Sequence, residues 1–221
     1  MAPDFEKKRK KLVEKLKDQD IVKNKAVIEA MLKVPRERFI PEEAKSSAYI
    51  DTPLSIGENQ TISAPHMVAM MLEILDLKNG DRVLEVGTGS GYHAALCAEL
   101  VSPGGHIYTI ERHENLAEKA EKNLREGGYQ NVTVIHGDGT LGYPEEAPYD
   151  KVLVTAASPN KIPQPLKDQL KIGGVMCIPA GTKGFAQNLY TIKKVDEGKY
   201  ETERITGVRF VPLIGKHGFD E

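Results

Sequence analysis

Tryptophan is absent from this sequence of 221 residues, and cysteine occurs only twice, at Cys97 and Cys177. Two distant cysteines cannot form the disulfide framework of a small secreted domain, so we expect both to be buried thiols in a reducing cytoplasm. The basic residues near the N-terminus are not followed by the apolar core of a signal peptide. No apolar run reaches the roughly 20 residues that span a bilayer, so the sequence predicts no membrane helix.

A marked excess of one charge is also missing. Lys and Arg together number 30 and Asp and Glu 32, which gives a formal net charge of −2. This balance argues against an extended nucleic-acid-binding face. The one basic cluster, residues 7–11, is flanked by Glu6 and Glu14, which favours a solvated helix face. The six histidines show neither an HExxH motif nor a pairing with cysteine, so no metal site is predicted.

Apolar periodicity and turn residues predict a regular alternation of strands and helices after the Asn79-Gly80 turn. The expected strands are residues 82–86, 106–110, 132–136, 151–155 and 174–179. The expected helices are residues 91–101, 113–126 and 163–170. Alternation of this kind is typical of a parallel sheet with helices on both faces. Two further strands, 188–195 and 200–213, have so short a connection that they must be antiparallel.

Helical patterns also precede this alternating region. Two helices are expected within residues 5–35, with Asn24 as the cap of the second, and Pro65 should open a third. Residues 50–64 show no period and many turn formers, so a functional loop is predicted there. We therefore expect a single α/β domain, residues 1–221, with a doubly wound, mostly parallel sheet. Its parts would be the N-terminal helices and covering loop (1–64), the core (65–180) and the C-terminal antiparallel strands (181–221).

The first expected strand is followed at once by three glycines two residues apart, Gly87, Gly89 and Gly91, and then by an apolar helical pattern. Glycine allows the sharp turn and lets a ligand approach the backbone, and a helix N-terminus attracts anionic groups. The GxGxG spacing differs from the GxGxxG of dinucleotide sites. Glu85, just before the loop, suits a cationic ligand such as the sulfonium of S-adenosylmethionine better than a phosphate. A nucleoside cofactor is therefore predicted, with a purely structural turn as the alternative.

Acidic residues also follow the next two expected strands. Glu111, 20 residues beyond Gly91, could accept hydrogen bonds from the ribose hydroxyls of an adenosine. Asp138, between Gly137 and Gly139, could bind the amino group of an adenine. An exposed strand end and a simple turn are the structural alternatives at these two positions. Because ligands of such sheets bind at the carboxyl ends of the strands, three acids there favour an adenosine site.

Ser63 and His66 lie where the unpatterned segment meets the helix expected at Pro65. On spacing alone, Ser63 is best explained as a hydroxyl that caps this helix. No GxSxG motif occurs, so the sequence does not indicate a Ser-His-Asp hydrolase.

Several stretches together resemble the protein-L-isoaspartate O-methyltransferase family. They are residues 34–41 (VPRERFIP), 56–65 (IGENQTISAP), 84–92 (LEVGTGSGY), 137–139 (GDG), 165–166, 169–170, 173–174 and 209–213 (RFVPL). The resemblance spans residues 26–214. Many methyltransferases share the glycine loop, whereas Gln-Thr-Ile-Ser-Ala-Pro is specific to this family. The first twenty or so residues are not part of the pattern.

The resemblance implies a Rossmann-like class I methyltransferase fold, with S-adenosylmethionine as cofactor and S-adenosylhomocysteine as product. The acceptor would be the free α-carboxylate of an L-isoaspartyl residue in a damaged protein or peptide. The resulting ester would reclose to a succinimide, which hydrolyses partly to aspartate. Further cofactor contacts are implied for Ile62, Ser63, His66, Arg112 and Gly139. Substrate contacts are implied for Thr61, Ser63 and Val211.

In this interpretation Ser63 is the catalytic residue, as an orienting hydrogen-bond donor. A carboxylate with a pKa of roughly 3.5–4 is ionised near neutral pH and needs no general base. We expect a monomeric cytoplasmic enzyme that binds neither nucleic acid nor membrane. The alternatives are a methyltransferase of RNA or a small molecule, an NAD-dependent oxidoreductase and a non-catalytic adenosine-binding regulator. The loop spacing disfavours the oxidoreductase, and the lack of a basic stripe disfavours an RNA substrate.

Overall fold

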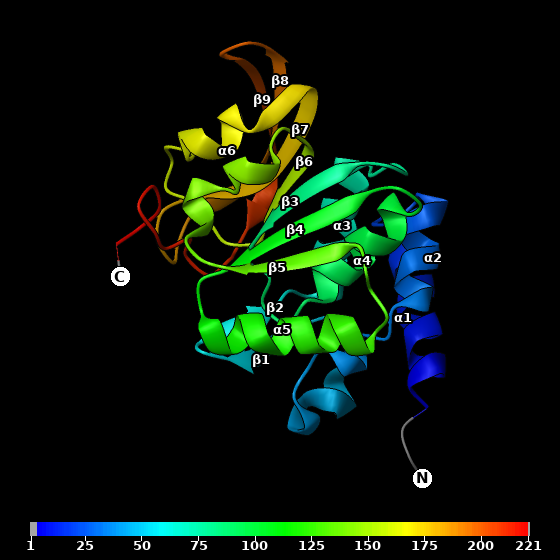
Figure 1. Ribbon diagram of the computed structural model, residues 1–221. Coiled ribbons are helices and arrows are strands. Elements are labelled where there is room, and N and C mark those ends of the chain that lie inside the picture. Colours follow the sequence, from blue (N-terminus) through cyan, green and yellow to red (C-terminus); the bar gives the residue numbers. More distant parts are fainter. Residues whose placement is uncertain (1–3, 221) are drawn as a thin grey trace.

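A sheet of seven strands runs through the middle of the structure (Figure 1), a computed structural model that describes residues 4–220. The strands are β3 (Arg82–Val86), β4 (His106–Glu111), β5 (Val132–His136), β6 (Tyr149–Val154), β7 (Leu170–Gly181), β8 (Gln187–Asp196) and β9 (Lys199–Val208). Their order across the sheet is β5-β4-β3-β6-β7-β8-β9. Strands β3 to β7 pair in parallel, whereas β8 is antiparallel to both β7 and β9. The predicted mostly parallel sheet with a C-terminal antiparallel pair is confirmed.

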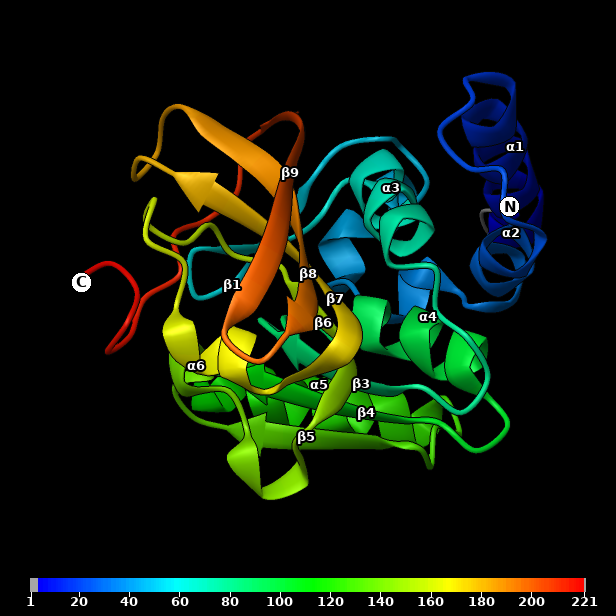
Figure 2. The same ribbon diagram turned by 90° about the horizontal axis from the view of Figure 1, so that it is seen from above.

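Helices cover both faces of this sheet. They are α1 (Phe5–Asp18), α2 (Lys25–Lys33), α3 (Pro65–Leu75), α4 (Tyr92–Val101), α5 (Glu114–Glu126) and α6 (Gln164–Asp168). Neighbouring residues of a strand point to opposite faces. On β3, Val83 therefore packs in a core with residues of α1 to α5, while Leu84 packs in a second core with Leu166 of α6. Helices α1 and α2 lie side by side at the end of the molecule away from the C-terminus (Figures 1 and 2).

The segment predicted to be a loop, residues 50–64, contains a small hairpin, so that prediction is wrong. Strands β1 (Leu54–Gly57) and β2 (Gln60–Ile62) pair antiparallel in a sheet of their own. Glu58 and Asn59 at its tip have φ angles of 50° and 55°, as in the left-handed turns that suit hairpins. These two residues lack the Asn-Gly signal usual for such a turn, which hides the hairpin from sequence patterns.

The last strand is shorter than predicted. It was expected over residues 200–213, but β9 ends at Val208, which pairs with the first residue of β8, Gln187. Within residues 4–220, β8 pairs with nothing in this chain segment beyond Val208. The chain instead turns back toward the end of β6, where the Ala157 N–H donates to Val211 O (2.8 Å) and the Leu213 N–H donates to Ala157 O (2.7 Å). This change of direction brings residues 211–213 to the strand ends of the parallel sheet.

Most predicted helix boundaries agree with the structure. Asn24 caps α2 by accepting a hydrogen bond from the Ala26 N–H at 2.9 Å, and Pro65 is the first residue of α3. Helix α6 is shorter than the predicted 163–170, because Leu170 already begins β7.

The turn before β3 is formed by Asn79 and Gly80, both exposed. Gly80 has a φ of 86°, and its N–H donates to Val101 O at the end of α4 (2.8 Å). Cys97 on α4 and Cys177 on β7 are buried and free, as predicted. Within residues 4–220, no helix combines the length and the apolar character that crossing a membrane would require.

Candidate active site

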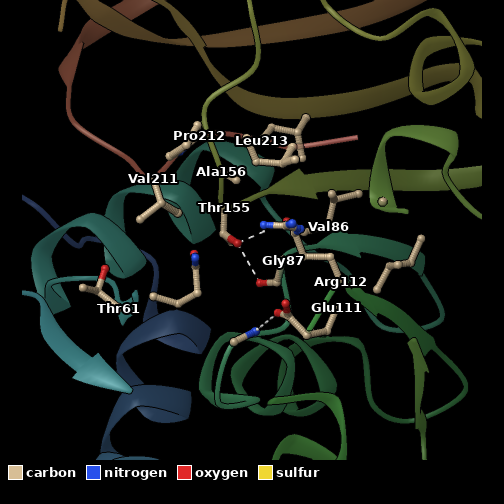
Figure 3. A pocket seen from close by; sticks show the side chains of 15 residues that line it. Thr61, Val86, Gly87, Glu111, Arg112, Thr155, Ala156, Val211, Pro212 and Leu213 are labelled. Carbon is tan, nitrogen blue, oxygen red and sulfur yellow. Dashed lines mark hydrogen bonds between the residues drawn. The ribbon is translucent and has the colours of Figure 1, made fainter. Parts of the chain in front are cut away.

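Two adjoining pockets lie at the carboxyl ends of the parallel strands, where ligands of doubly wound sheets bind. The inner pocket encloses a cavity of about 60 Å³, and its lining comes from the glycine loop, the end of β4 and the C-terminal segment (Figure 3). The outer pocket is wider, about 640 Å³, which lies within the roughly 300–1,000 Å³ typical of ligand sites. Thr61, Thr155 and Val211 line both pockets and form their common wall.

The glycine loop between β3 and α4 forms one side of the inner pocket. Gly87, Gly89 and Gly91 have φ angles of 95°, 55° and 90°, which other residues rarely adopt. A Cβ atom on Gly87 would also lie 2.3 Å from Thr155 Oγ1, so this position needs glycine for space as well. Gly87 and Gly89 line the pocket, whereas Gly91 is the N-cap of α4. The loop therefore exposes bare backbone to a ligand.

Glu111 lies in the inner pocket with Arg112 beside it (Figure 3). The Glu111 side chain is 5% exposed and accepts hydrogen bonds from the Gly89 N–H (2.8 Å) and the His113 N–H (3.1 Å), one on each carboxylate oxygen. A carboxylate has about four acceptor positions. The Glu111 carboxylate is thus held rigidly and can still accept two hydrogen bonds, as a pair of ribose hydroxyls requires.

Asp138 lies beside the inner pocket and is not one of its lining residues, whereas Gly139 is. The Asp138 carboxylate accepts hydrogen bonds from the Thr140 N–H (2.8 Å), the Thr140 hydroxyl (2.7 Å) and the Lys216 N–H (2.8 Å). Burial raises the pKa of Asp138, but these hydrogen bonds outweigh it and leave the pKa below its ordinary value. The structure therefore gives Asp138 a clear role in holding the C-terminal segment against the third strand end.

Glu85 does not line either pocket, contrary to the expectation of a carboxylate that faces a cationic ligand. Its side chain points from β3 into the core and is fully buried, where the Thr109 hydroxyl donates to it at 2.5 Å. Burial raises the pKa of Glu85 to about 8. Glu85 is therefore protonated near neutral pH, and the charge argument made from its place in the sequence is wrong.

Ser63 lines the outer pocket, immediately before α3. Ala64 is the N-cap of α3 and no side chain caps that helix, so the capping explanation of Ser63 is wrong. The Ser63 hydroxyl makes no hydrogen bond to any residue that the structure describes, which leaves it available to a ligand. Ile62 is buried and lines, with Ser63 and Gly89, a smaller cavity between β2 and the glycine loop.

His66, on the first turn of α3, also lines the outer pocket. Both its backbone N–H and its Nδ1 lie 2.9 Å from Oδ1 of Asp51. The two contacts fix the imidazole relative to the segment that leads into the hairpin. The structure thus brings Thr61, Ser63 and Val211, for which substrate contacts are implied, together in one pocket, and it places His66, for which a cofactor contact is implied, in that same pocket and not among the lining of the inner one.

Two residues of the site were not singled out from the sequence. Thr155 follows β6, and its hydroxyl donates to Gly87 O at 2.7 Å (Figure 3). Arg36 is fully buried and donates through Nη2 to Ser63 O (2.8 Å) and through Nε to Ala48 O (3.0 Å). The position of Thr155 at the end of the strand expected over residues 151–155 is a signal by which it could be identified as a site residue. Nothing in the sequence marked Arg36 as a partner of Ser63, because the contact joins residues 27 positions apart.

The sequence matches the profile of a family described as protein-L-isoaspartate(D-aspartate) O-methyltransferase (PCMT) over residues 7–218. A protein-L-isoaspartate O-methyltransferase of Methanothermobacter thermautotrophicus is 54% identical over 211 residues, which cover 96% of this chain and 97% of that protein. One from Ignicoccus hospitalis is 56% identical over 210 residues, which cover 95% and 99% of the two chains.

Solved structures of similar proteins share the fold over nearly the whole of this chain. One protein-L-isoaspartate O-methyltransferase superposes with a TM-score of 0.87 at 31% identity, over 95% of this chain and 67% of the other. A Plasmodium falciparum protein described as a beta-aspartate methyltransferase (PCMT), in complex with S-adenosyl-L-homocysteine, gives a TM-score of 0.82 at 31% identity, over 93% and 98% of the two chains.

Glu85→Gln should remove a pH dependence of stability. The pKa of Glu85 is raised from 4.5 to about 8 in the folded chain, so protonated Glu85 favours folding, and this contribution is lost as the pH rises from the unfolded to the folded pKa. Between about pH 5 and 8, the free energy of unfolding of the wild type should fall relative to the variant by a few kcal/mol, as an order of magnitude. Urea denaturation across this range measures it. The exposed Glu114→Gln is the control, and an unchanged difference at all pH values would contradict a buried neutral Glu85.

Proposed function

The chain belongs to the protein-L-isoaspartate(D-aspartate) O-methyltransferase family. We propose that the inner pocket binds the cofactor and the outer pocket binds the methyl acceptor. The enzyme transfers a methyl group from S-adenosylmethionine to the free α-carboxylate of L-isoaspartyl residues in damaged proteins or peptides. The methyl ester then recloses to a succinimide, which hydrolyses partly to aspartate. Methyl transfer is the step for which the site must account.

The inner pocket is the proposed site of the cofactor. When bound, S-adenosylmethionine supplies a methyl group made electrophilic by its sulfonium centre. Glu111 would hold the ribose hydroxyls, because its carboxylate is fixed by two amides and keeps free acceptor positions. Gly139 and Arg112 would flank the nucleoside, and Asp138 would reach the adenine amino group with its remaining acceptor position. The methionine portion would lie along the glycine loop toward Ile62, Ser63 and His66.

The charge distribution of the outer pocket supports an anionic acceptor, and this is the observation that carries the assignment. None of its 15 lining residues is Asp or Glu, although the chain contains 32 acidic residues. Arg209 adds a cation that forms no ion pair with any residue in the described part of the chain. A carboxylate that enters this pocket therefore meets an attractive charge, and no carboxylate of the lining repels it.

Catalysis in such a site depends on positioning. An α-carboxylate has a pKa of about 3.5, so it is already ionised near neutral pH and needs no base. The Ser63 hydroxyl would donate to one oxygen of this carboxylate and direct the other toward the methyl group. Arg36 holds the Ser63 backbone from the buried side, at 2.8 Å from the Ser63 carbonyl oxygen. Three residues further on, the Asp51 carboxylate fixes His66 through its contacts with the His66 backbone N–H and Nδ1.

Val211 would bind the backbone of the substrate peptide. Its carbonyl already accepts a hydrogen bond from the Ala157 N–H, so we assign its N–H to the peptide. Thr61, which shares the wall between the pockets, would approach the same peptide with its hydroxyl. Recognition through main-chain groups tolerates different flanking side chains, as the repair of many proteins requires.

We further propose that the enzyme acts as a monomer in the cytoplasm, on protein substrates and without a nucleic-acid partner. The residues assigned to both pockets belong to the same protomer, so the proposed reaction needs no residue from a second copy. Two buried free thiols support a cytoplasmic location. The net charge of −2 supports a protein substrate without a nucleic-acid partner.

Glu111→Ala should weaken binding of S-adenosylhomocysteine tenfold or more, because a charge-assisted hydrogen bond of about 1.5–3 kcal/mol is lost. Isothermal titration calorimetry measures this directly. Glu114→Ala, an exposed change three residues further on, is the matched control and should leave the affinity unchanged. Equal affinities in the wild type and the Glu111 variant would contradict the ribose assignment.

Ser63→Ala should lower the turnover number while it leaves cofactor affinity within a few-fold, since only the orientation of the acceptor is lost. Stability should stay within about 0.5 kcal/mol of the wild type, because the side chain caps no helix. Steady-state kinetics, calorimetry and urea denaturation on one preparation separate these effects. The exposed Ser55→Ala serves as the control. Normal turnover with reduced stability would instead point to a structural role.

The activity itself is tested with two peptides of the same sequence, one with an isoaspartyl residue and the other with an aspartyl residue at the same position. The cofactor carries a labelled methyl group. Single-turnover methylation should be confined to the isoaspartyl peptide, because an aspartyl carboxylate lies one methylene away from the required position. The chemical step should show no rise due to acceptor ionisation between about pH 6 and 8, since that ionisation is complete well below this range. Comparable methylation of both peptides would overturn the isoaspartyl assignment.

A further inference from the structure

Phe185 is the most exposed large hydrophobic residue in the described part of the chain. Its exposed fraction is 79%, compared with 58% for Ile172 and 55% for Ile50. It lies in the loop of residues 182–186 between β7 and β8, and it lines the outer pocket. An aromatic ring in water beside a binding pocket is a large apolar surface that a ligand can cover.

The loop holds Phe185 in a defined place. The Thr182 N–H donates to Ala186 O (3.0 Å), and the Phe185 N–H donates to Thr182 O (3.2 Å). Where the loop leaves β7, the Gly181 N–H donates to Ser158 O at 3.0 Å. These hydrogen bonds close a turn at the end of β7, so the ring is presented by a fixed backbone.

Other apolar side chains complete a surface that suits a peptide. Met67 of α3 and Pro53, just before the hairpin, line the same pocket as Phe185. The outer pocket, at about 640 Å³, is the wider of the two, and its lining extends from Ser63 and Arg209 to Phe185. A residue next to the one whose carboxylate meets Ser63 and Arg209 would therefore lie in the part of the pocket that Phe185 borders.

We propose that Phe185 is a specificity-determining residue that binds an apolar side chain next to the isoaspartyl residue of the substrate. The inference rests on the proposed use of the outer pocket by the damaged peptide. Main-chain contacts allow peptides of many sequences to bind, and contact with Phe185 makes their affinities differ. An apolar flanking residue buries the aromatic ring on binding, whereas glycine leaves the ring in water. The enzyme accordingly repairs isoaspartyl residues beside bulky apolar side chains at lower substrate concentrations.

The experiment uses a series of isoaspartyl peptides in which the residue before or after the damaged position is Gly, Leu or Phe. For the wild type, the KM should be about tenfold lower with Phe than with Gly at one of the two positions, as burial of part of an aromatic ring would give. The kcat should be the same for both peptides. Phe185→Ala should reduce the KM ratio to about twofold or less, and Phe185→Leu should retain an intermediate ratio.

Ile172→Ala provides the matched control, because Ile172 is also exposed but lines neither pocket. This variant should keep the full wild-type preference. The inference would be overturned by a wild type that shows no preference at either position, or by a Phe185→Ala enzyme that keeps the full preference. In both cases, methylation of the Gly-flanked isoaspartyl peptide would still support the proposed function. Failure to methylate any isoaspartyl peptide would overturn both.

Discussion

The turn from β3 into α4 is the constraint on which the rest of the site depends. It is tied to both neighbours of β3, since the Gly87 N–H donates to Ile110 O on β4 and the Thr155 hydroxyl after β6 donates to Gly87 O. The next glycine, Gly89, holds the Glu111 carboxylate through its N–H. A side chain at Gly87 would displace Thr155, and with it the wall between the two pockets. One loop therefore sets the position of the cofactor site relative to the acceptor site.

The two pockets differ in charge although they share a wall. The inner pocket contains Glu111, which suits a ligand rich in hydroxyl donors, with Arg112 beside it, whereas the outer pocket contains Arg209 and no acidic side chain. Glu85 adds no charge to either, because burial keeps it protonated near neutral pH. The acids of this site are thus either used for the cofactor or neutralised by the fold. This separation lets one cleft accept a cationic cofactor and an anionic substrate.

The sequence predicts the parallel strands and the glycine loop because both depend on local patterns, an apolar run that ends in a turn. It also places Glu111 correctly, since a residue at a strand end must lie near the other strand ends. It fails where a side chain's environment comes from distant segments. Glu85 is fully buried in the core, and the Asp138 carboxylate accepts a hydrogen bond from an amide 78 residues away, which leaves it fewer acceptor positions for a ligand. The hairpin of residues 54–62 is missed because its turn conformation depends on tertiary context and its residue types do not signal it.

The turn of Asn79 and Gly80 has a consequence for the chemical ageing of the enzyme. Deamidation of an Asn-Gly pair begins when the glycine nitrogen attacks the asparagine side chain, which yields the same succinimide through which repair proceeds. In the folded chain the Gly80 N–H is held by Val101 O at 2.8 Å, so the attack requires this hydrogen bond to break. The bond is lost whenever the end of α4 opens. The working lifetime of this repair enzyme is therefore tied to its conformational stability, because local unfolding exposes it to the damage that it reverses in other proteins.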